Sequence, residues 1–330
     1  IPEARAVLDY LRSVYGQKTL AGISGAKNAA AIRQITGKDP AIIGIDLSGW
    51  NSPRWGKTYT PVVQKAVDQA KDWWSQGVIV TMQFHWKHPM KDNGTAWVGA
   101  HGKNPPSGPF DMGKALVPGT PEHKAFIDDL DKHADYLEQL ARARVPVLWR
   151  PFHEIDGGWF WWTDKDKPEN TAAMWRLMFD HLVKKRKLHN LIWVYSAALK
   201  TPGKGKDVTQ IDLRKRFYPG PEYVDIAGID IYPNAYFGWG DPKDDAYQKA
   251  FDIMTQVAPG KMLALCEGSA IPNPRLMTTQ GPRWLYCLPW FADTNANPAD
   301  WIKTTYTDDL IITRDKLPPL HPSQPNPPSH

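Results

Sequence analysis

Residues 147–162 read VLWRPFHEIDGGWFWW, and this stretch guides the interpretation of the whole chain. It begins as an apolar run typical of a buried strand and then reaches Arg150, His153 and Glu154. Three ionisable side chains cannot leave water together unless they pair with one another or face a wet cleft. The stretch therefore predicts a buried strand whose end carries a polar site.

The tryptophans of the same stretch indicate what this site receives. Trp159, Trp161 and Trp162 follow the charged residues closely. An indole is a large, rigid platform with one polar N–H, and the axial C–H bonds of a pyranose ring form a matching apolar face. We expect these rings to line a cleft that accepts sugars.

Composition limits the class of protein. The chain has 330 residues, of which 42% are apolar and 23% charged, as in ordinary globular proteins of one large or two small domains. The net charge of +5 is spread along the chain, and its densest run, residues 184–187, is interpreted as a solvated helix face. Nucleic acid is not expected as a partner. No apolar stretch approaches the length of a membrane span.

Two details bear on processing and export. The chain begins at Ile1 without a methionine, which indicates a processed or trimmed chain, and Asn93-Gly94-Thr95 matches a glycosylation acceptor, which is compatible with secretion. The two cysteines, Cys266 and Cys287, lie in strand-like runs and are interpreted as buried free thiols. A disulfide between them is left open, although adjacent barrel strands seldom provide its geometry.

Apolar runs bounded by turn residues predict eight strands, and segments with apolar residues at helical spacing lie between them. The predicted strands are 19–24, 41–47, 78–86, 145–154, 191–196, 224–232, 262–267 and 284–290. The clearest predicted helices are 61–76, 123–142, 172–187 and 245–257.

Regular alternation of strand and helix favours parallel strands joined by crossover helices, and eight such units fit a (β/α)₈ barrel, an α/β fold. An open doubly wound sheet is not favoured, because residues 44–49 lack the spacing of a dinucleotide-binding turn. We predict a single-domain TIM barrel over residues 1–317. Residues 318–330 are rich in proline and are predicted to form a tail or linker.

Chemistry in such a barrel belongs at the carboxyl ends of the strands. Two carboxylates are predicted there, Glu154 on the fourth strand and Glu267 on the seventh. Paired carboxylates at a sugar-sized cleft can hydrolyse a glycosidic bond. We expect His153, Arg150 and Tyr232 to keep Glu267 ionised, and an apolar, Trp-lined setting to keep Glu154 protonated.

Other residue types admit plainer interpretations. Asp46, Asp156 and Asp230 are interpreted as hydrogen-bond anchors, with a possible supporting role for Asp46. His85 and His88 have the spacing of a metal site, but no acidic or cysteine partner accompanies them. No metal or organic cofactor is predicted.

The motif around Glu154, together with Asp230-Ile231-Tyr232-Pro233 and Leu265-Cys266-Glu267-Gly268, resembles glycoside hydrolase family 26. The likeness covers the whole predicted barrel. Its members are mostly endo-β-1,4-mannanases with a (β/α)₈ fold, so the resemblance implies retaining hydrolysis with Glu154 as acid/base and Glu267 as nucleophile. The family often has Ser before this Glu, where this chain has Cys266.

The resemblance also implies that His153 lies beside the acid/base, that Tyr232 hydrogen-bonds the nucleophile, and that the sugar sites are lined by His85, Trp159 and Trp290. From their positions at strand ends, Trp86 is also expected to bind substrate and Arg150 to support the catalytic residues. We expect a secreted monomer that cleaves internal β-1,4-mannosidic bonds in mannan, glucomannan or galactomannan and needs no protein partner. The alternatives are the same chemistry on β-glucan or xylan, and release of mannobiose from chain ends. An alternative of another class is a noncatalytic carbohydrate-binding protein.

Overall fold

The structure is a computed structural model that describes residues 1–48, 59–91, 94–102, 105–198, 210–232, 246–274, 277, 281–292 and 294–320. Strands and helices alternate along these residues. The strands are β1 (Thr19–Ser24), β2 (Ile42–Asp46), β3 (Ile79–Gln83), β4 (Val147–Arg150), β5 (Leu191–Ala198), β6 (Ile226–Ile231), β7 (Met262–Gly268), β8 (Tyr286–Pro289) and β9 (Ile311–Ile312). The helices include α1 (Pro2–Val14), α2 (Ala26–Thr36), α3 (Tyr59–Ser75), α4 (Met112–Ala115), α5 (Pro121–Arg142), α6 (Pro168–Phe179), α7 (Ile211–Phe217), α9 (Ala246–Val257) and α11 (Ala299–Thr307).

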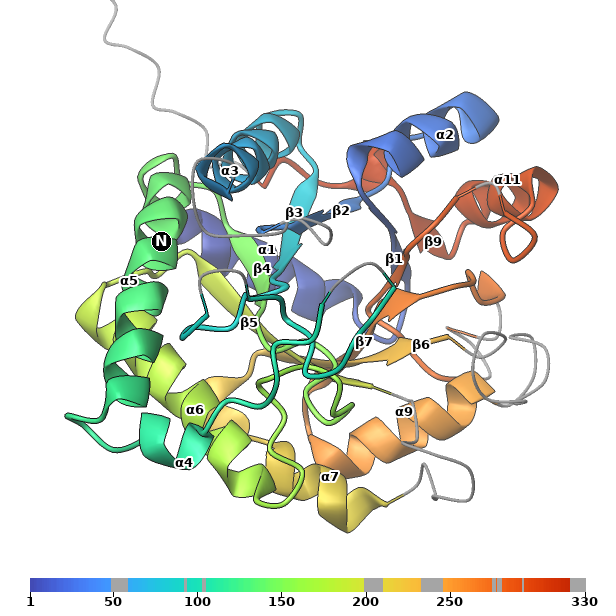
Figure 1. The fold of residues 1–330 in the computed structure, drawn as a ribbon. Coiled ribbons are helices and arrows are strands. Elements are labelled where there is room, and N and C mark those ends of the chain that lie inside the picture. Colours follow the sequence, from blue (N-terminus) through green and yellow to red (C-terminus); the bar gives the residue numbers. More distant parts are fainter. Residues whose placement is uncertain are drawn as a thin grey trace, which may run out of the picture.

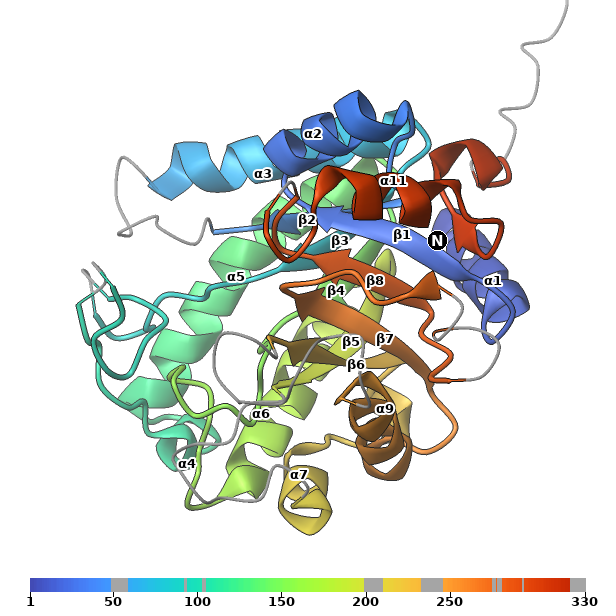
Figure 2. The ribbon, with the colours of Figure 1, turned by 90° about the vertical axis from the view of Figure 1, so that its right-hand side faces the viewer.

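Strands β1 to β8 form a closed parallel barrel. Each strand pairs with the next, and β1 pairs with both β8 and β2, so the ring has no open edge. The short β9 adds to β1 on the outside of this order. Helices surround the strands in Figure 1, with α2 and α11 on one side and α7 and α9 on the other in Figure 2. The predicted (β/α)₈ fold and all eight predicted strands are confirmed.

The helices follow from their apolar periodicity. In α5 the buried residues Phe126, Leu130, Ala134 and Leu137 recur every three or four positions and face the barrel. Thr120 caps this helix by accepting a hydrogen bond from the His123 N–H at 3.1 Å. The predicted helix over 172–187 is also present, but its last part, Asp180–Lys185, winds as a π-helix.

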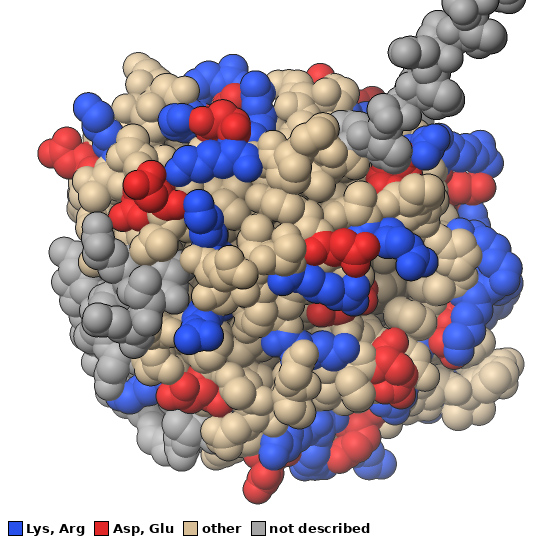
Figure 3. Space-filling view, turned by 180° about the vertical axis from the view of Figure 1, so that it is seen from behind, with Lys and Arg blue, Asp and Glu red and all other residues tan. Residues whose placement is uncertain are grey.

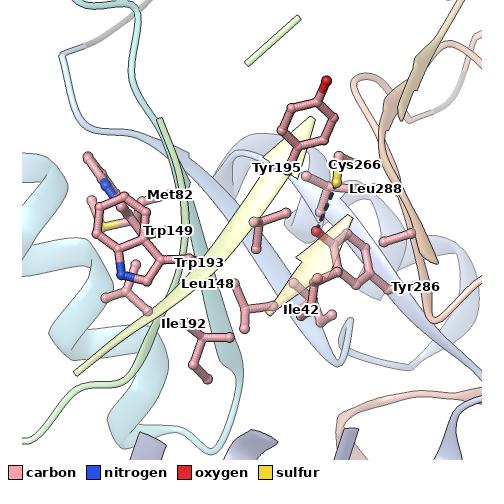
Figure 4. Packing of buried hydrophobic residues seen from close by; sticks show 14 of the residues in the cluster. Ile42, Met82, Leu148, Trp149, Ile192, Trp193, Tyr195, Cys266, Tyr286 and Leu288 are labelled. Carbon is pink, nitrogen blue, oxygen red and sulfur yellow. Dashed lines mark hydrogen bonds between the residues drawn. The ribbon is translucent and has the colours of Figure 1, made fainter. Parts of the chain in front are cut away.

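The barrel interior is filled by side chains from alternate strand positions. Leu288 on β8 needs the space that two glycines leave, because a Cβ on Gly22 or Gly44 would lie 2.8 or 2.9 Å from its methyl carbons. Figure 4 shows Cys266 and Tyr286 facing each other, with Cys266 Sγ 3.2 Å from Tyr286 Oη. This close packing fills the barrel beneath the site.

The surface and the cysteines agree with the sequence-based expectations. Positive and negative side chains are interspersed on the face in Figure 3, rather than gathered in one basic stripe. Cys266 and Cys287 are buried and free, as predicted. Among the helices that the structure describes, none is both long and apolar enough to cross a bilayer.

Two predictions fall at the edge of the described chain. Asn93 of the glycosylation motif and residues 321–330 of the predicted tail lie outside the described residues. The start of the tail is described, and Leu320 is buried against the barrel.

Candidate active site

Three strands bring their polar residues together at the carboxyl end of the barrel. Arg150 ends β4, Asp230 lies near the end of β6 and Glu267 near the end of β7, while Glu154 follows β4 in the chain. One carboxylate oxygen from each of Glu154, Asp230 and Glu267 lies within 4.8 Å of the others. The predicted carboxylate pair is thus assembled, with Asp230 as a third member.

Glu154 is carried by a turn, not by the strand that was predicted to reach it. Strand β4 ends at Arg150, and Phe152 and Glu154 have φ values of 47° and 50°. Positive φ costs a residue other than glycine about 1–3 kcal/mol and persists where surrounding structure imposes it. The reversal lifts Glu154 out of the strand and over the barrel mouth, where it meets Glu267.

Hydrogen bonds from β5 and α7 hold this turn. The Ile155 N–H donates to the Ser196 carbonyl at 3.1 Å, and Asp156 Oδ1 accepts from the Ala198 N–H at 2.7 Å. Asp156 also pairs with the buried Arg214. Its interpretation as an anchor is confirmed.

A β-bulge in β7 turns Glu267 toward the site. The register passes from Ile229 opposite Leu265 to Asp230 opposite Glu267, so Cys266 is an extra residue in its strand. Alternation would send adjacent side chains to opposite faces. The bulge instead lets Cys266 reach Tyr286 inside the barrel while Glu267 reaches Arg150.

Arg150 connects two of the three carboxylates. Its Nη1 donates to Asp230 Oδ2 and its Nη2 to Glu267 Oε2, both at 2.9 Å, and Gln83 also accepts from it. Burial opposes the guanidinium charge, but Asp230 and Glu267 outweigh burial and raise the pKa of Arg150. Asp230 also accepts from Ser196 at 2.7 Å, which confirms its anchoring role.

Glu267 is held by donors on both oxygens. Besides Arg150 on Oε2, the Tyr232 hydroxyl donates to Oε1. Burial and then the Glu267 charge raise the pKa of Tyr232, so this hydroxyl keeps its proton. Both oxygens of Glu267 thus accept hydrogen bonds, an arrangement that suits the predicted nucleophile. The prediction that His153 also donates to Glu267 is wrong, because His153 Nε2 bonds His85 Nε2.

Glu154 has the opposite environment. Burial raises its pKa well above the ordinary value, and the nearby charges of Asp230 and Glu267 raise it further. The Trp159 indole N–H, which donates to Glu154 Oε2 at 2.6 Å, and the Arg150 charge act against this shift. Glu154 therefore keeps its proton to higher pH than an ordinary glutamate, which suits the predicted acid/base role.

The distance between the two carboxyl groups distinguishes two mechanisms. Carboxyl groups are about 5–5.5 Å apart in retaining glycosidases and roughly 6.5–9.5 Å apart in inverting ones. One oxygen of Glu154 lies within 4.8 Å of one oxygen of Glu267, a separation that suits the retaining arrangement and is shorter than the inverting one requires. The geometry favours direct attack by one carboxylate.

Three carboxylates in one place also have the composition of a divalent-cation site. Here, however, the Arg150 guanidinium already pairs with both Asp230 and Glu267, and the Tyr232 hydroxyl donates to the other oxygen of Glu267. The donor set is committed to hydrogen bonds within the protein. It fits a carboxylate pair for acid/base and nucleophilic chemistry better than a metal.

Not every predicted sugar-binding ring faces the site. Trp86 is fully buried, stacks on Phe84 and Phe126 and donates to Asp129, so the expectation that it binds sugar is wrong. Trp161 and Trp162 are likewise core residues with 1% and 0% exposure. The Trp161 indole N–H donates to the Trp86 carbonyl at 2.7 Å and the Trp162 indole N–H to the His153 carbonyl at 3.0 Å, so both rings are held inside the protein.

Other predicted contacts remain predictions. Trp159, in the loop after β4, and Trp290, directly after β8, are half-buried, and the backbone N–H of Trp290 donates to the Gly268 carbonyl at 2.8 Å. Gly157 lacks a side chain where a Cβ would lie 2.4 Å from the Trp159 ring. This glycine allows Trp159 to fold back over Glu154.

The side chains of His85 and His88 contact polar groups of the protein. His88 lies 3.3 Å from the Pro109 carbonyl and accepts from the Met90 N–H, while His85 Nδ1 lies 2.5 Å from Asp46 Oδ2. Gln83 and Ser196 belong to the hydrogen-bonded site, and Lys87 lies near Asp46, but the residue pattern did not single them out. Thr81 and Gln83, polar residues two apart in an apolar strand, are the signal that indicates an inward polar face.

Comparison with known proteins agrees with this geometry. The family model described as glycosyl hydrolase family 26 matches residues 2–316. A mannan endo-1,4-beta-mannosidase from Thermothelomyces thermophilus is 34% identical over 95% of this chain and 61% of its own length, so this chain spans less than two thirds of that relative.

Solved structures agree as well. The structure of GH26A from a Muricauda species has a TM-score of 0.79 and 31% identity, covering 96% of this chain and 97% of that one. A beta-mannanase from a symbiotic protist of the termite Reticulitermes speratus, complexed with gluco-manno-oligosaccharide, has a TM-score of 0.76 and 30% identity over 96% of this chain and 94% of its own.

Proposed function

This chain belongs to glycosyl hydrolase family 26, and we propose that it is a retaining endo-β-1,4-mannanase. One observation carries the proposal: two carboxyl groups within 4.8 Å of each other have opposite environments. Glu267 accepts from Arg150 and Tyr232, whereas burial and neighbouring anions keep Glu154 protonated. This asymmetry is what a double displacement requires.

In the first step, the Glu267 carboxylate attacks the anomeric carbon while Glu154 gives its proton to the leaving glycosidic oxygen. A covalent glycosyl–enzyme forms and the leaving chain departs. Glu154, now a carboxylate, then takes a proton from water, and the hydroxide attacks the same carbon and releases Glu267. The anomeric configuration is retained, and Glu154 regains its proton.

The substrate part of the proposal rests on similarity. The Thermothelomyces relative is named a mannan endo-1,4-beta-mannosidase, and the protist structure holds a gluco-manno-oligosaccharide. We propose mannan, glucomannan or galactomannan as substrate, hydrolysed outside the cell by a monomer. The half-buried rings of Trp159 and Trp290 support a site that binds sugar.

The test is reducing-sugar release, with product sizing, from linear mannan, glucomannan, barley β-glucan and xylan, using wild type and Glu267→Ala in parallel. Mixed short manno-oligosaccharides from wild type alone support the proposal. Mannobiose as sole early product indicates action from chain ends, and activity only on glucan or xylan overturns the substrate. Tight polymer binding without any release favours a carbohydrate-binding protein.

A further inference from the structure

Three side chains outside the carboxylate pair connect β2 to the turn that carries Glu154. Asp46 is the last residue of β2, and its Oδ2 lies 2.5 Å from His85 Nδ1. On the other side of the ring, His85 Nε2 lies 3.3 Å from His153 Nε2. The side chains of Asp46 and His85 are 12% and 3% exposed, and His153 is 1% exposed. Water has little access to this chain of contacts.

The direction of the hydrogen bond between Asp46 and His85 is defined because Asp46 is surrounded by donors. Its Oδ1 lies 3.1 Å from the Ser48 N–H nitrogen and 3.3 Å from Ser48 Oγ, and the His85 backbone N–H approaches at 3.4 Å. Burial tends to raise the pKa of Asp46, but the contact with His85, the Lys87 charge and the Ser48 N–H together lower it. An ionised carboxylate only accepts, so His85 Nδ1 carries a proton.

The second link joins two ring nitrogens, and only one of them can hold the shared proton. Burial and the Arg150 charge lower the pKa of His153 well below its ordinary value, so this ring is neutral and has one N–H. The 3.3 Å contact needs a donor nitrogen on one ring and an acceptor nitrogen on the other. In the arrangement proposed below, His153 Nε2 is the donor and the unprotonated His85 Nε2 is the acceptor.

We propose that Asp46 is a positioning residue, which fixes the His85 tautomer and thereby locks His153, the neighbour of Glu154. Held by Asp46, His85 presents a bare Nε2 to the His153 Nε2–H. His153 Nδ1 is then an acceptor, buried and without a hydrogen-bond partner in the described part of the chain.

The contact with His85 restrains His153 within a turn whose backbone conformation is strained. His153 lies between Phe152 and Glu154, the two residues at positive φ. Its ring packs edge-on against His85 at 4.4 Å between centroids, and its carbonyl accepts from the Trp162 indole at 3.0 Å. Losing Asp46 frees His85 to exchange tautomers, so the His153 ring loses its donor–acceptor match and the turn under Glu154 loosens.

The first experiment needs no substrate. Nitrogen-15 NMR of histidine-labelled wild type, Asp46→Asn and Asp129→Asn reports which ring nitrogens carry protons. Asp129 is a matched control: it is buried and accepts from Trp86, beside His85, but lies on helix α5, outside the three-residue chain of contacts. We expect wild-type His85 protonated at Nδ1 and bare at Nε2, with His153 protonated at Nε2. Only Asp46→Asn should change these signals. A bare His85 Nδ1, a protonated His85 Nε2 or an unchanged Asp46→Asn spectrum overturns the proposal.

The second experiment rests on the proposed function. Asp46→Asn should lower kcat on mannan about 10- to 100-fold, the usual cost of removing a histidine's orienting partner, with KM and melting temperature little changed. Asp129→Asn should keep the wild-type kcat. A rise in KM at constant kcat overturns the positioning role. If wild type cleaves no polymer, the proposed function fails, whereas the NMR spectra still decide the role of Asp46.

Discussion

The indole N–H of Trp159 donates to Glu154 Oε2 at 2.6 Å, so a ring beside the site also acts on the proton affinity of the predicted acid. A donor bonded to the charged form of a carboxyl group lowers its pKa. At Glu154 this bond acts against burial, Asp230 and Glu267, all of which raise the pKa. The working range of the enzyme therefore depends on a balance that single substitutions can shift.

Trp159→Phe keeps an aromatic face and removes the N–H. Without the donor, the pKa of Glu154 rises further, and the alkaline limb of the kcat/KM profile against pH moves to higher pH. Kinetics on a soluble mannan across that limb measure the shift. An alkaline limb that moves to lower pH contradicts the assigned balance.

Glu154→Gln tests the origin of the alkaline limb itself. In wild type, activity falls as pH rises through the pKa of Glu154, because the acid has lost its proton. The amide cannot donate a proton to the leaving oxygen, so kcat/KM falls about 10²–10⁴-fold and no longer shows this limb. If Glu154→Gln keeps the wild-type alkaline limb, a group other than Glu154 causes that limb.

Glu154→Ala and Glu267→Ala should differ in their response to azide. With an aryl mannoside whose leaving group needs no acid, Glu154→Ala still forms the glycosyl–enzyme, and azide, which needs no general base, replaces water. We expect azide to restore turnover and to give a product of retained configuration. Glu267→Ala has no nucleophile, so any azide product has inverted configuration. NMR of the products distinguishes the two, and interchanged outcomes reverse the assignments.

Arg150→Met leaves Asp230 and Glu267 buried without their cation. Breaking a buried pair by removing one partner costs about 3–5 kcal/mol of unfolding free energy. Urea unfolding measures this loss. Arg216→Met is the matched control, because Arg216 pairs with Glu169 at the exposed surface and its removal should change stability little. Equal losses in both variants would show that Arg150 has no special structural role.

Asp129→Asn should change how stability depends on pH. Burial raises the pKa of Asp129 to about 7 from an ordinary 3.8. Between these values the folded chain binds more protons than the unfolded chain, so Asp129 lowers stability as pH rises from about 4 to about 7. The amide does not titrate and should remove this part of the slope. Thermal unfolding of both proteins across this range measures it, and parallel slopes would contradict the raised pKa.

The barrel itself could be predicted from residue pattern. Strands of a (β/α)₈ barrel are buried on both faces and appear as continuous apolar runs, and amphipathic segments such as 123–142 separate them. The predicted strand 262–267 differs from β7 only at its last residue. The fourth strand was predicted too long, since nothing local in the run through Phe152 and Glu154 reveals two positive φ values.

The predicted site residues were found from their positions at strand ends, but such a position does not show which way a side chain points. It places Arg150, Tyr232 and Glu267 correctly, because parallel strands share one carboxyl edge. It cannot tell an indole that faces the site from one that faces the helices. Trp86 lies three residues beyond the end of β3 and packs on Phe126 of α5, a contact set by long-range packing.

The sequence by itself determined the strand–helix alternation, the carboxylate pair and the family resemblance, since these depend on residue type and local spacing. Only the tertiary structure decided which oxygen each donor reaches, that a bulge at Cys266 turns Glu267 inward, and that Asp46 and His85 meet across β2 and β3. Proton affinity depends on burial and on charges brought together from distant positions. The separate roles of Glu154 and Glu267 are therefore properties of the closed barrel rather than of either local segment.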